Sequence, residues 1–243
     1  MNPESLVVLT RPRPEIAVIQ LNRPDKKNAM NLAMAREIQQ HLDDCEADQH
    51  IRVVVLAGQP GCFSAGMDIQ AFRQGELPVV EPNGFAGLIH AQLSKVLIAA
   101  VDGVAYGGWF EMALACDLIV ASRSARFSFP ETGLGLVAAQ GGCARLPLRI
   151  SPFIAMDWLL SGQVITAEEA HIHGVVSRLC ESDALQAAVQ LAEQIAGKSP
   201  QAIQAVKAIV KQGRQVAETA VFEYQQDWVH QLRQAQQTKS TVS

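Results

Sequence analysis

The sequence lacks the features that mark membrane, secreted and nucleic-acid-binding proteins. Its longest stretch without Asp, Glu, Lys or Arg is Val53–Met67, and glycine and proline interrupt it, whereas a membrane-spanning helix needs about 20 mostly apolar residues. The start of the chain has no basic and apolar leader. The five cysteines are far apart without a Cys-x-x-Cys pair, which favours free thiols in a reducing compartment over disulfides or a zinc knuckle. A net charge of −4 argues against nucleic-acid binding. We therefore predict a globular cytoplasmic protein without a membrane or nucleic-acid partner.

The sequence contains enough hydrophobic residues to form a sizeable core, because they make up 49% of its 243 residues. Short β-branched runs alternate with helical patterns over the first half, which predicts a mostly parallel sheet followed by a helical C-terminal region. The predicted strands are Leu6–Leu9, Glu15–Leu21, Ile51–Ala57, Val96–Val101, Asp117–Ala121 and Val175–Leu179.

Capping residues predict where the helices begin and end. Asn31 can cap a helix whose apolar face is Leu32, Ala35, Ile38, Leu42 and Cys45. In the second half, Ser-Pro pairs and a capping box predict helix starts, and glycines predict helix ends. These signals are Ser151-Pro152, Ser199-Pro200 and Thr166-x-x-Glu169 for the starts, and Gly162, Gly174, Gly197 and Gly213 for the ends.

Two loops between a predicted strand and a predicted helix contain small residues. The first is Cys62–Asp68, before a short helix at Ile69–Arg73, and the second is Asp102–Gly107, before a helix at Gly108–Cys116. Backbone N–H groups at such helix starts can bind developing negative charge. Each loop alone is equally compatible with an ordinary turn.

Two acids stand in apolar surroundings near these loops. Glu111 either opposes the helix dipole in the first turn or is a buried acid with a raised pKa. Glu131 precedes Thr132–Ala144, a run without any charged residue, so a solvated surface role explains it poorly. Two such acids with two amide-rich loops are typical of general acid/base chemistry on an acyl carbonyl.

Four groups of residues, in this order and spacing, resemble the crotonase superfamily, the enoyl-CoA hydratase/isomerase group. They are Arg23-Pro24 with Asn28-Ala29, Phe63–Asp68, Gly107-Gly108 with Glu111 and Cys116-Asp117, and Pro130-Glu131 with Gly135, Gly141-Gly142 and Arg145-Leu146. The resemblance implies an α/β fold of the crotonase type. Its repeated ββα spiral core, with the coenzyme A and acyl site, would span residues 1–190. A helical C-terminal trimerisation region would span residues 191–243.

The resemblance also implies roles for individual residues. The Ser64 and Gly108 amides would form an oxyanion hole for the thioester oxygen, Glu111 would activate water, and Glu131 would handle the proton at the α-carbon. The residues implied around coenzyme A are Lys26, Lys27, Ala29, Ala65, Gly66, Met67 and Asp68. The implied reaction is hydration of a 2-enoyl-CoA, or the reverse dehydration of a 3-hydroxyacyl-CoA. The implied protein is a homotrimer or dimer of trimers without a metal or any cofactor beyond the coenzyme A of the substrate.

Three features differ from the family pattern. Trp109 stands where the third glycine of the oxyanion loop is usual, and we expect it to narrow the acyl pocket. Ala138-Ala139-Gln140 replaces a proline-containing stretch that helps to seat the water. The family's last helix has no evident counterpart before Ser243.

Alternative functions remain open at this point. An enoyl-CoA isomerase or a carnitinyl-type dehydratase would use the same loops, and a non-catalytic family member would use neither acid. An RNA-binding homologue would need a basic face, for which the chain offers Lys198, Lys207, Lys211 and Arg214.

Two other candidate sites are weaker. The histidines 171 and 173 lie at a predicted helix end, where the helix dipole explains them without a metal. Cys62 has no evident histidine partner that would make it a nucleophile.

Overall fold

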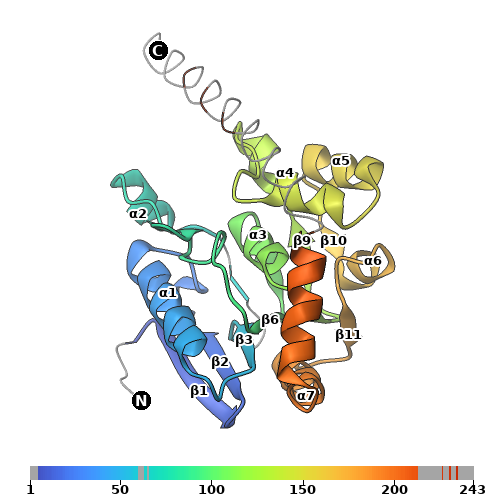
Figure 1. Ribbon diagram of the computed structural model, residues 1–243. Coiled ribbons are helices and arrows are strands. Elements are labelled where there is room, and N and C mark those ends of the chain that lie inside the picture. The colour runs from blue at the N-terminus through green and yellow to red at the C-terminus, as the bar shows by residue number, and fades with distance from the viewer. Residues whose placement is uncertain are drawn as a thin grey trace.

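The computed structural model describes residues 5–59, 63, 64, 66–212, 226, 230 and 234. Its largest sheet has six strands in the order β1-β2-β3-β6-β8-β11 (Figure 1). β1 is antiparallel to β2, and every other neighbouring pair is parallel. The strands are β1 (Val7–Arg13), β2 (Ile16–Leu21), β3 (Val53–Ala57), β6 (Val96–Val101), β8 (Leu118–Ser122) and β11 (Arg178–Cys180). The predicted, mostly parallel α/β sheet is confirmed.

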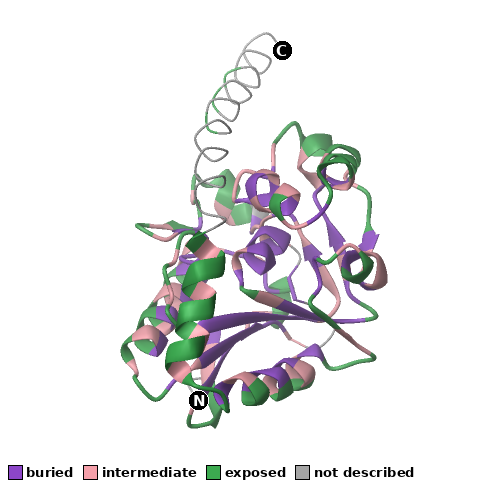
Figure 2. Cartoon of the chain, turned by 45° about the vertical axis from the view of Figure 1, so that its right-hand side comes forward, coloured by how far each residue is buried: buried purple, intermediate pink, exposed green. Residues whose placement is uncertain are grey.

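The central strands of this sheet are buried on both faces. All residues of β3 and β6 are buried, and the strands pair in parallel with Val53 opposite Val96. The small side chains of α7 (Ala184–Ala196) pack on one face. The other face belongs to the larger core, which includes α1 (Leu32–Ala47) and α3 (Gly108–Ala115). Figure 2 shows buried strands with helices whose outer sides are exposed. Burial on two faces explains why these strands are continuously apolar.

A second, three-stranded sheet determines where α3 begins. β7 (Val104–Tyr106) pairs in parallel with β9 (Arg126–Ser128), and β10 (Ile165–Thr166) pairs with the other side of β9. Only Gly107 separates β7 from α3, so the end of this strand places the N-terminus of the helix.

The remaining elements are short. β4 (Val79–Val80) and β5 (Gly84–Phe85) form a two-stranded ribbon. Further α-helices are α2 (Ile69–Arg73), α4 (Gly142–Arg145), α5 (Pro152–Ser161) and α6 (Ala167–Ile172). Residues 200–212 form a further helical stretch. The 3-10 helices are η1 (Pro24–Lys26), η2 (Pro130–Leu134) and η3 (Leu146–Leu148).

Most of the predicted helix caps are confirmed. The side chain of Asn31 accepts a hydrogen bond from the Met34 amide at 3.0 Å, and Thr166 accepts one from the Glu169 amide at 3.1 Å. Gly162 is the left-handed C-cap of α5. Ser151 precedes α5 but makes no side-chain cap bond, so its proline neighbour alone marks that start.

Some predicted strand boundaries, and part of the predicted apolar face of α1, differ from the structure. β1 continues to Arg13 through a register irregularity, which places the hairpin turn after the predicted position. The last strand begins at Arg178 rather than Val175, because the amides of Val175 and Val176 donate to the Ala170 carbonyl at the end of α6. On α1, Met34 is buried whereas Leu32 is only partly so.

The predicted division after residue 190 falls inside α7, whose Leu191, Ala192 and Ala196 belong to the core beneath the sheet. The predicted helix end at Gly213 and the missing last helix lie outside the described residues. In the part of the chain that the structure describes, no helix combines the length and the apolar character required to cross a bilayer.

Candidate active site

The N-terminus of α3 presents an amide without an acceptor. Gly107 caps the helix with φ +58° and ψ −129°, a conformation that favours glycine, and its own N–H donates to the Ser128 carbonyl at 2.9 Å. Gly108 is the first helical residue, and its amide has no acceptor among the described residues. The positive end of the helix dipole therefore coincides with a free donor, which suits a developing oxyanion.

Glu111 lies in the first turn of the same helix and is only 2% exposed. Its Oε1 accepts a hydrogen bond from the Gly142 amide at 2.8 Å. Burial and then the negative charge of Glu131 raise the pKa of Glu111 to about 8, against the opposing effect of amide bonds from Gly142 and Gln140. Of the two predicted explanations, the structure therefore favours the buried acid.

Glu131 reaches the same place from η2. Its Oε1 lies 2.8 Å from the position that a Cβ on Gly107 would occupy, so the carboxyl group covers the cap of α3. Its Oε2 is buried and has no hydrogen-bond partner among the described residues. Burial raises the pKa of Glu131 to about 7. The structure thus brings the two predicted acids together at one helix start.

The loop at residues 63–68 offers a different donor from the predicted one. The Ser64 amide donates to the Val104 carbonyl at 3.1 Å in a bridge beside β7, so it is not available for a substrate oxygen. The Gly66 amide donates to Ser64 Oγ, and the Asp68 amide donates to the Met30 carbonyl. The Met67 amide has no acceptor in the described part of the chain. Sequence spacing could not show this, because it depends on the register of Ser64 against β7.

Trp109 is completely buried and is not among the residues that line the two cavities described below. Its Nε1 donates to the Gly66 carbonyl at 2.9 Å, and its ring meets the Phe63 ring edge-on at 5.5 Å. The two amide-bearing segments are therefore joined directly by this side chain.

The residues predicted around coenzyme A differ in their surroundings. Lys26 and Lys27 are exposed on the turn that ends η1. Asp68 instead caps α2 and forms an ion pair with Arg23 at 2.7 Å, and this hydrogen-bonded guanidinium lowers the pKa of Asp68. Ala65 lies outside the described residues.

Arg23 and Asn28 have structural roles that the motif alone did not reveal. Arg23 also donates to the Ala29 carbonyl at 2.7 Å. The buried Asn28 side chain accepts from the Arg23 amide and donates to the Phe63 carbonyl. These bonds connect the turn at residues 23–29 to the loop that presents the Met67 amide.

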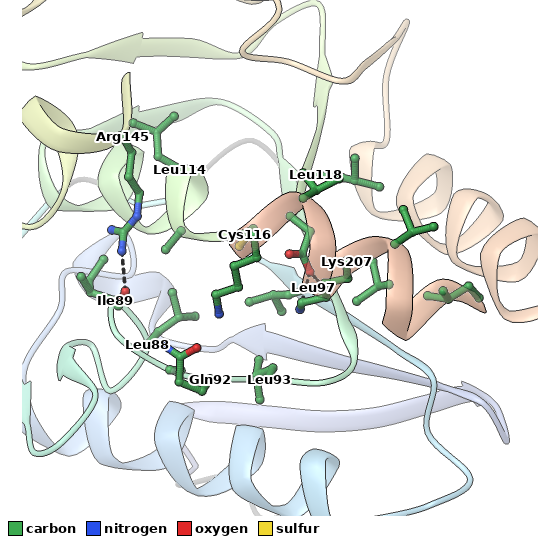
Figure 3. Close-up of a pocket in the computed structure, with 18 of the residues that line it drawn as sticks. Leu88, Ile89, Gln92, Leu93, Leu97, Leu114, Cys116, Leu118, Arg145 and Lys207 are labelled. Carbon is green, nitrogen blue, oxygen red and sulfur yellow. Dashed lines mark hydrogen bonds and ion pairs between the residues drawn. The ribbon is translucent and has the colours of Figure 1, made fainter. Parts of the chain in front are cut away.

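Two cavities border this region. One of about 270 Å³ lies beside Glu131, and its wall is otherwise mainly apolar, including Phe129, Val137 and Leu159. A larger one of about 720 Å³ lies at the opposite, C-terminal end of α3 (Figure 3). Glu111 and Glu131 do not line it, whereas Glu131 lines the smaller cavity.

Arg145 connects the wall of the larger cavity to the active site. It donates to the Ile89 carbonyl at 2.7 Å (Figure 3). It also donates to the Gln140 carbonyl at 3.2 Å. It thereby supports the loop that ends at Gly142, the hydrogen-bond donor to Glu111.

The other candidate sites find little support. No group of three metal-ligating side chains exists within the described ranges, and His171 Nδ1 is 2.9 Å from the Val176 carbonyl. Of the predicted basic face, Lys207 is paired with Asp117 at 2.7 Å, and Arg214 is outside the described residues, as is Cys62.

Comparison with known proteins agrees with this geometry. The family model described as enoyl-CoA hydratase/isomerase matches residues 12–243. A carnitinyl-CoA dehydratase of Salmonella arizonae is 39% identical over 221 residues, which are 89% of this chain and 84% of the relative.

Solved structures give the same result. A carnitinyl-CoA dehydratase from Mycobacterium avium superimposes with a TM-score of 0.90 at 33% identity, covering 96% of this chain and 94% of that one. An enoyl-CoA hydratase from Mycobacterium tuberculosis superimposes with a TM-score of 0.84 at 42% identity, covering 91% and 88%. The chain belongs to the enoyl-CoA hydratase/isomerase family of the crotonase superfamily.

Proposed function

We propose that this protein is an acyl-CoA hydro-lyase, which hydrates a 2-enoyl-CoA or dehydrates the corresponding 3-hydroxyacyl-CoA. The observation on which this rests is the buried Glu111 and the partly buried Glu131, whose Oε2 is buried, beside the free amide of Gly108. Burial raises the pKa of Glu111 to about 8 and that of Glu131 to about 7, so near neutral pH the pair can hold one protonated and one ionised carboxyl group. Hydration needs one base and one acid at the same time, which a pair in this state supplies.

The thioester oxygen would be held by two backbone amides. Gly108 supplies one at the helix start, and Met67 replaces Ser64 as the second, because the Ser64 amide is already bonded to Val104. Two such donors stabilise the enolate that forms when water adds to the β-carbon.

The two acids would then divide the proton transfers. In the reactive state of the pair, Glu111 is ionised and the proton is on Glu131. Glu111 takes a proton from water as the water oxygen bonds to the β-carbon, and Glu131 delivers its proton to the α-carbon. The sum is addition of one H₂O across the double bond, and proton exchange with solvent restores the starting state. The unpartnered Oε2 of Glu131 supports its role at the substrate.

The coenzyme A moiety would lie along Lys26, Lys27, Ala29 and the loop at residues 65–67, outside the buried acids. Lys26 and Lys27 are exposed cations and suit the phosphates of coenzyme A. No further cofactor is needed, because the thioester itself activates the α-carbon. We place the protein in the cytoplasm.

The cavity beside Glu131 favours a short, uncharged acyl group. Its volume is about 270 Å³, and among the described residues that line it, Phe129 is the one with an aromatic ring. A quaternary ammonium group is usually recognised by several aromatic rings. The second candidate, a carnitinyl-type substrate, is favoured by the names of the relatives from Salmonella and Mycobacterium avium.

A panel of thioesters tests these alternatives. We expect crotonyl-CoA to lose its enoyl absorbance and to gain the mass of one water, faster than crotonobetainyl-CoA does. Faster turnover of crotonobetainyl-CoA than of crotonyl-CoA would establish a carnitinyl-type substrate. Conversion of 3-butenoyl-CoA without a mass change would establish an isomerase, and turnover of no thioester would contradict the catalytic proposal.

We further propose that the chain assembles as a homotrimer or a dimer of trimers, with residues 191–243 taking part in the interface. The exposed apolar side chains of α5 support assembly, since Phe153 is 88% exposed and Leu160 is 64% exposed. Sedimentation equilibrium tests this, and a stable monomer at micromolar concentration would contradict it.

A further inference from the structure

Trp109 forms a hydrogen bond that reaches the proposed second donor of the oxyanion hole. Its Nε1 donates to the carbonyl oxygen of Gly66 at 2.9 Å. This carbonyl and the Met67 N–H belong to the same peptide group. Because a trans peptide is planar, the direction of the carbonyl fixes the direction of the N–H on its other side. The indole therefore acts on the orientation of the Met67 amide without touching the substrate.

The peptide between Gly66 and Met67 is held from two sides. The Met30 amide also donates to the Gly66 carbonyl, at 3.0 Å, so the oxygen has two donors in different segments. Gly66 itself has φ +112° and nothing within 4 Å of the position of a Cβ. A glycine in open space offers little resistance to rotation of the following peptide. The bonds from Met30 and Trp109 are what hold that peptide in one orientation.

Burial and an aromatic contact hold the Trp109 indole in place. It is 0% exposed, and the Phe63 ring packs against it edge-on, with ring centroids 5.5 Å apart. Trp109 also directly follows Gly108, the proposed first donor. One side chain thus sets the position of the second amide relative to the first.

We propose that Trp109 is a positioning residue that aims the Met67 amide at the thioester oxygen. This inference rests on the proposed function, because it assigns a role within the same oxyanion hole. It does not require Trp109 to contact substrate, and its burial agrees with that.

The test removes the indole N–H and keeps a buried aromatic ring. We expect Trp109→Phe to lower kcat for crotonyl-CoA hydration by about 10- to 100-fold, which is less than the loss of a whole donor, with little change in KM. The matched control is Trp158→Phe. Trp158 is equally buried, and the ring contact identified for it is with His173 on another part of the fold, so this variant should keep kcat.

A spectroscopic measurement separates positioning from folding. Bound cinnamoyl-CoA absorbs at longer wavelength when its carbonyl is polarised by hydrogen bonds, and we expect Trp109→Phe to reduce this shift. An unchanged shift and kcat would overturn the inference. So would a loss of kcat with the full shift retained, because the carbonyl would still be held. Should the Phe variant not fold, benzothienylalanine at position 109 removes only the N–H, and the same outcomes apply.

The two proposals fail in different ways. If the wild type hydrates no thioester, the proposed function is wrong, whereas the cinnamoyl-CoA shift still decides the role of Trp109. If the wild type is active and Trp109→Phe matches it in kcat and shift, only the positioning role is wrong.

Discussion

Glu111 and Glu131 share an apolar environment, but their carboxyl groups are held differently. Glu111 accepts the Gly142 amide at 2.8 Å, whereas Oε2 of Glu131 is buried without a partner among the described residues. A buried polar atom without a hydrogen bond is destabilising, and such atoms are rare in folded proteins unless a ligand or water completes them. Glu131 is therefore the acid that we expect to contact the reacting carbon.

Replacing either acid with its amide should abolish most hydration. Glu111→Gln and Glu131→Gln keep the shape of the side chain but cannot exchange a proton, and we expect each to lower kcat for crotonyl-CoA by about 100- to 10,000-fold. Steady-state kinetics on crotonyl-CoA and 3-butenoyl-CoA measure this, with circular dichroism as the control for folding. If Glu111→Gln kept full turnover of 3-butenoyl-CoA, the isomerase alternative would hold.

The same acids make stability depend on pH. The ordinary pKa of a glutamate is 4.5, and burial raises that of Glu111 to about 8. Between these values the unfolded chain loses a proton that the folded chain keeps, so the free energy of unfolding falls as pH rises. Relative to the wild type, Glu111→Gln should gain about 1–3 kcal/mol of stability on going from pH 5 to pH 8. Urea denaturation at both pH values measures this, and a constant difference would mean that Glu111 is ionised in the folded protein.

At the scale of elements, the start of α3 combines strand, cap and helix in three consecutive steps. β7 ends at Tyr106, Gly107 turns the chain, and Gly108 begins the helix. Gly107 has positive φ and faces the Glu131 carboxyl group at the distance where a Cβ would collide, 2.8 Å. The backbone conformation of Gly107 and the position of Glu131, the proposed catalytic acid, are thus coupled at one residue.

Gly107→Ala should therefore damage both stability and activity. We expect a loss of about 1–3 kcal/mol in unfolding free energy from the strained conformation, and a drop in kcat of about 100-fold or more because Glu131 must move from its place. Gly75→Ala is the matched control, since Gly75 also has positive φ (+83°) but has nothing within 4 Å of a Cβ. It should lose stability and keep kcat; an equal loss of kcat in both variants would refute the coupling.

The sequence predicted those elements whose signals are local. The Asn31 cap, the strand at Val96–Val101 and the capping box at Thr166 depend on neighbouring residues, and the structure confirms them. The free amide at Met67 and the role of Trp109 depend on pairing between distant segments, Ser64 with Val104 and Trp109 with Gly66. Periodicity and caps contain no information about such pairing, so they could not show that the Ser64 amide is bonded to Val104 whereas the Met67 amide has no acceptor among the described residues.

At the scale of the whole molecule, apolar side chains are exposed on two helical parts of the chain. α5 exposes Phe153, Met156 and Leu160, and the helical stretch at residues 200–212 exposes Val206 and Ile209. Single exposed apolar residues need no explanation, but groups of them on one helix are typical of interaction surfaces. A homotrimer or dimer of trimers would bury such groups.

The assembly proposal is best tested on α5. Phe153 is 88% exposed and lines neither cavity, so Phe153→Asp should leave the fold of the isolated chain intact. In an assembly it would bury a charge without a partner, which is strongly unfavourable. We expect sedimentation equilibrium to show a shift from the trimer or hexamer toward monomer at micromolar concentration.

The control is Phe72→Asp on α2, which lies on the opposite side of the molecule from α5 (Figure 1) and should preserve the assembly. An unchanged oligomer in Phe153→Asp would exclude α5 from the interface, because no contact surface retains its affinity after an unpaired charge replaces a buried aromatic ring at its centre.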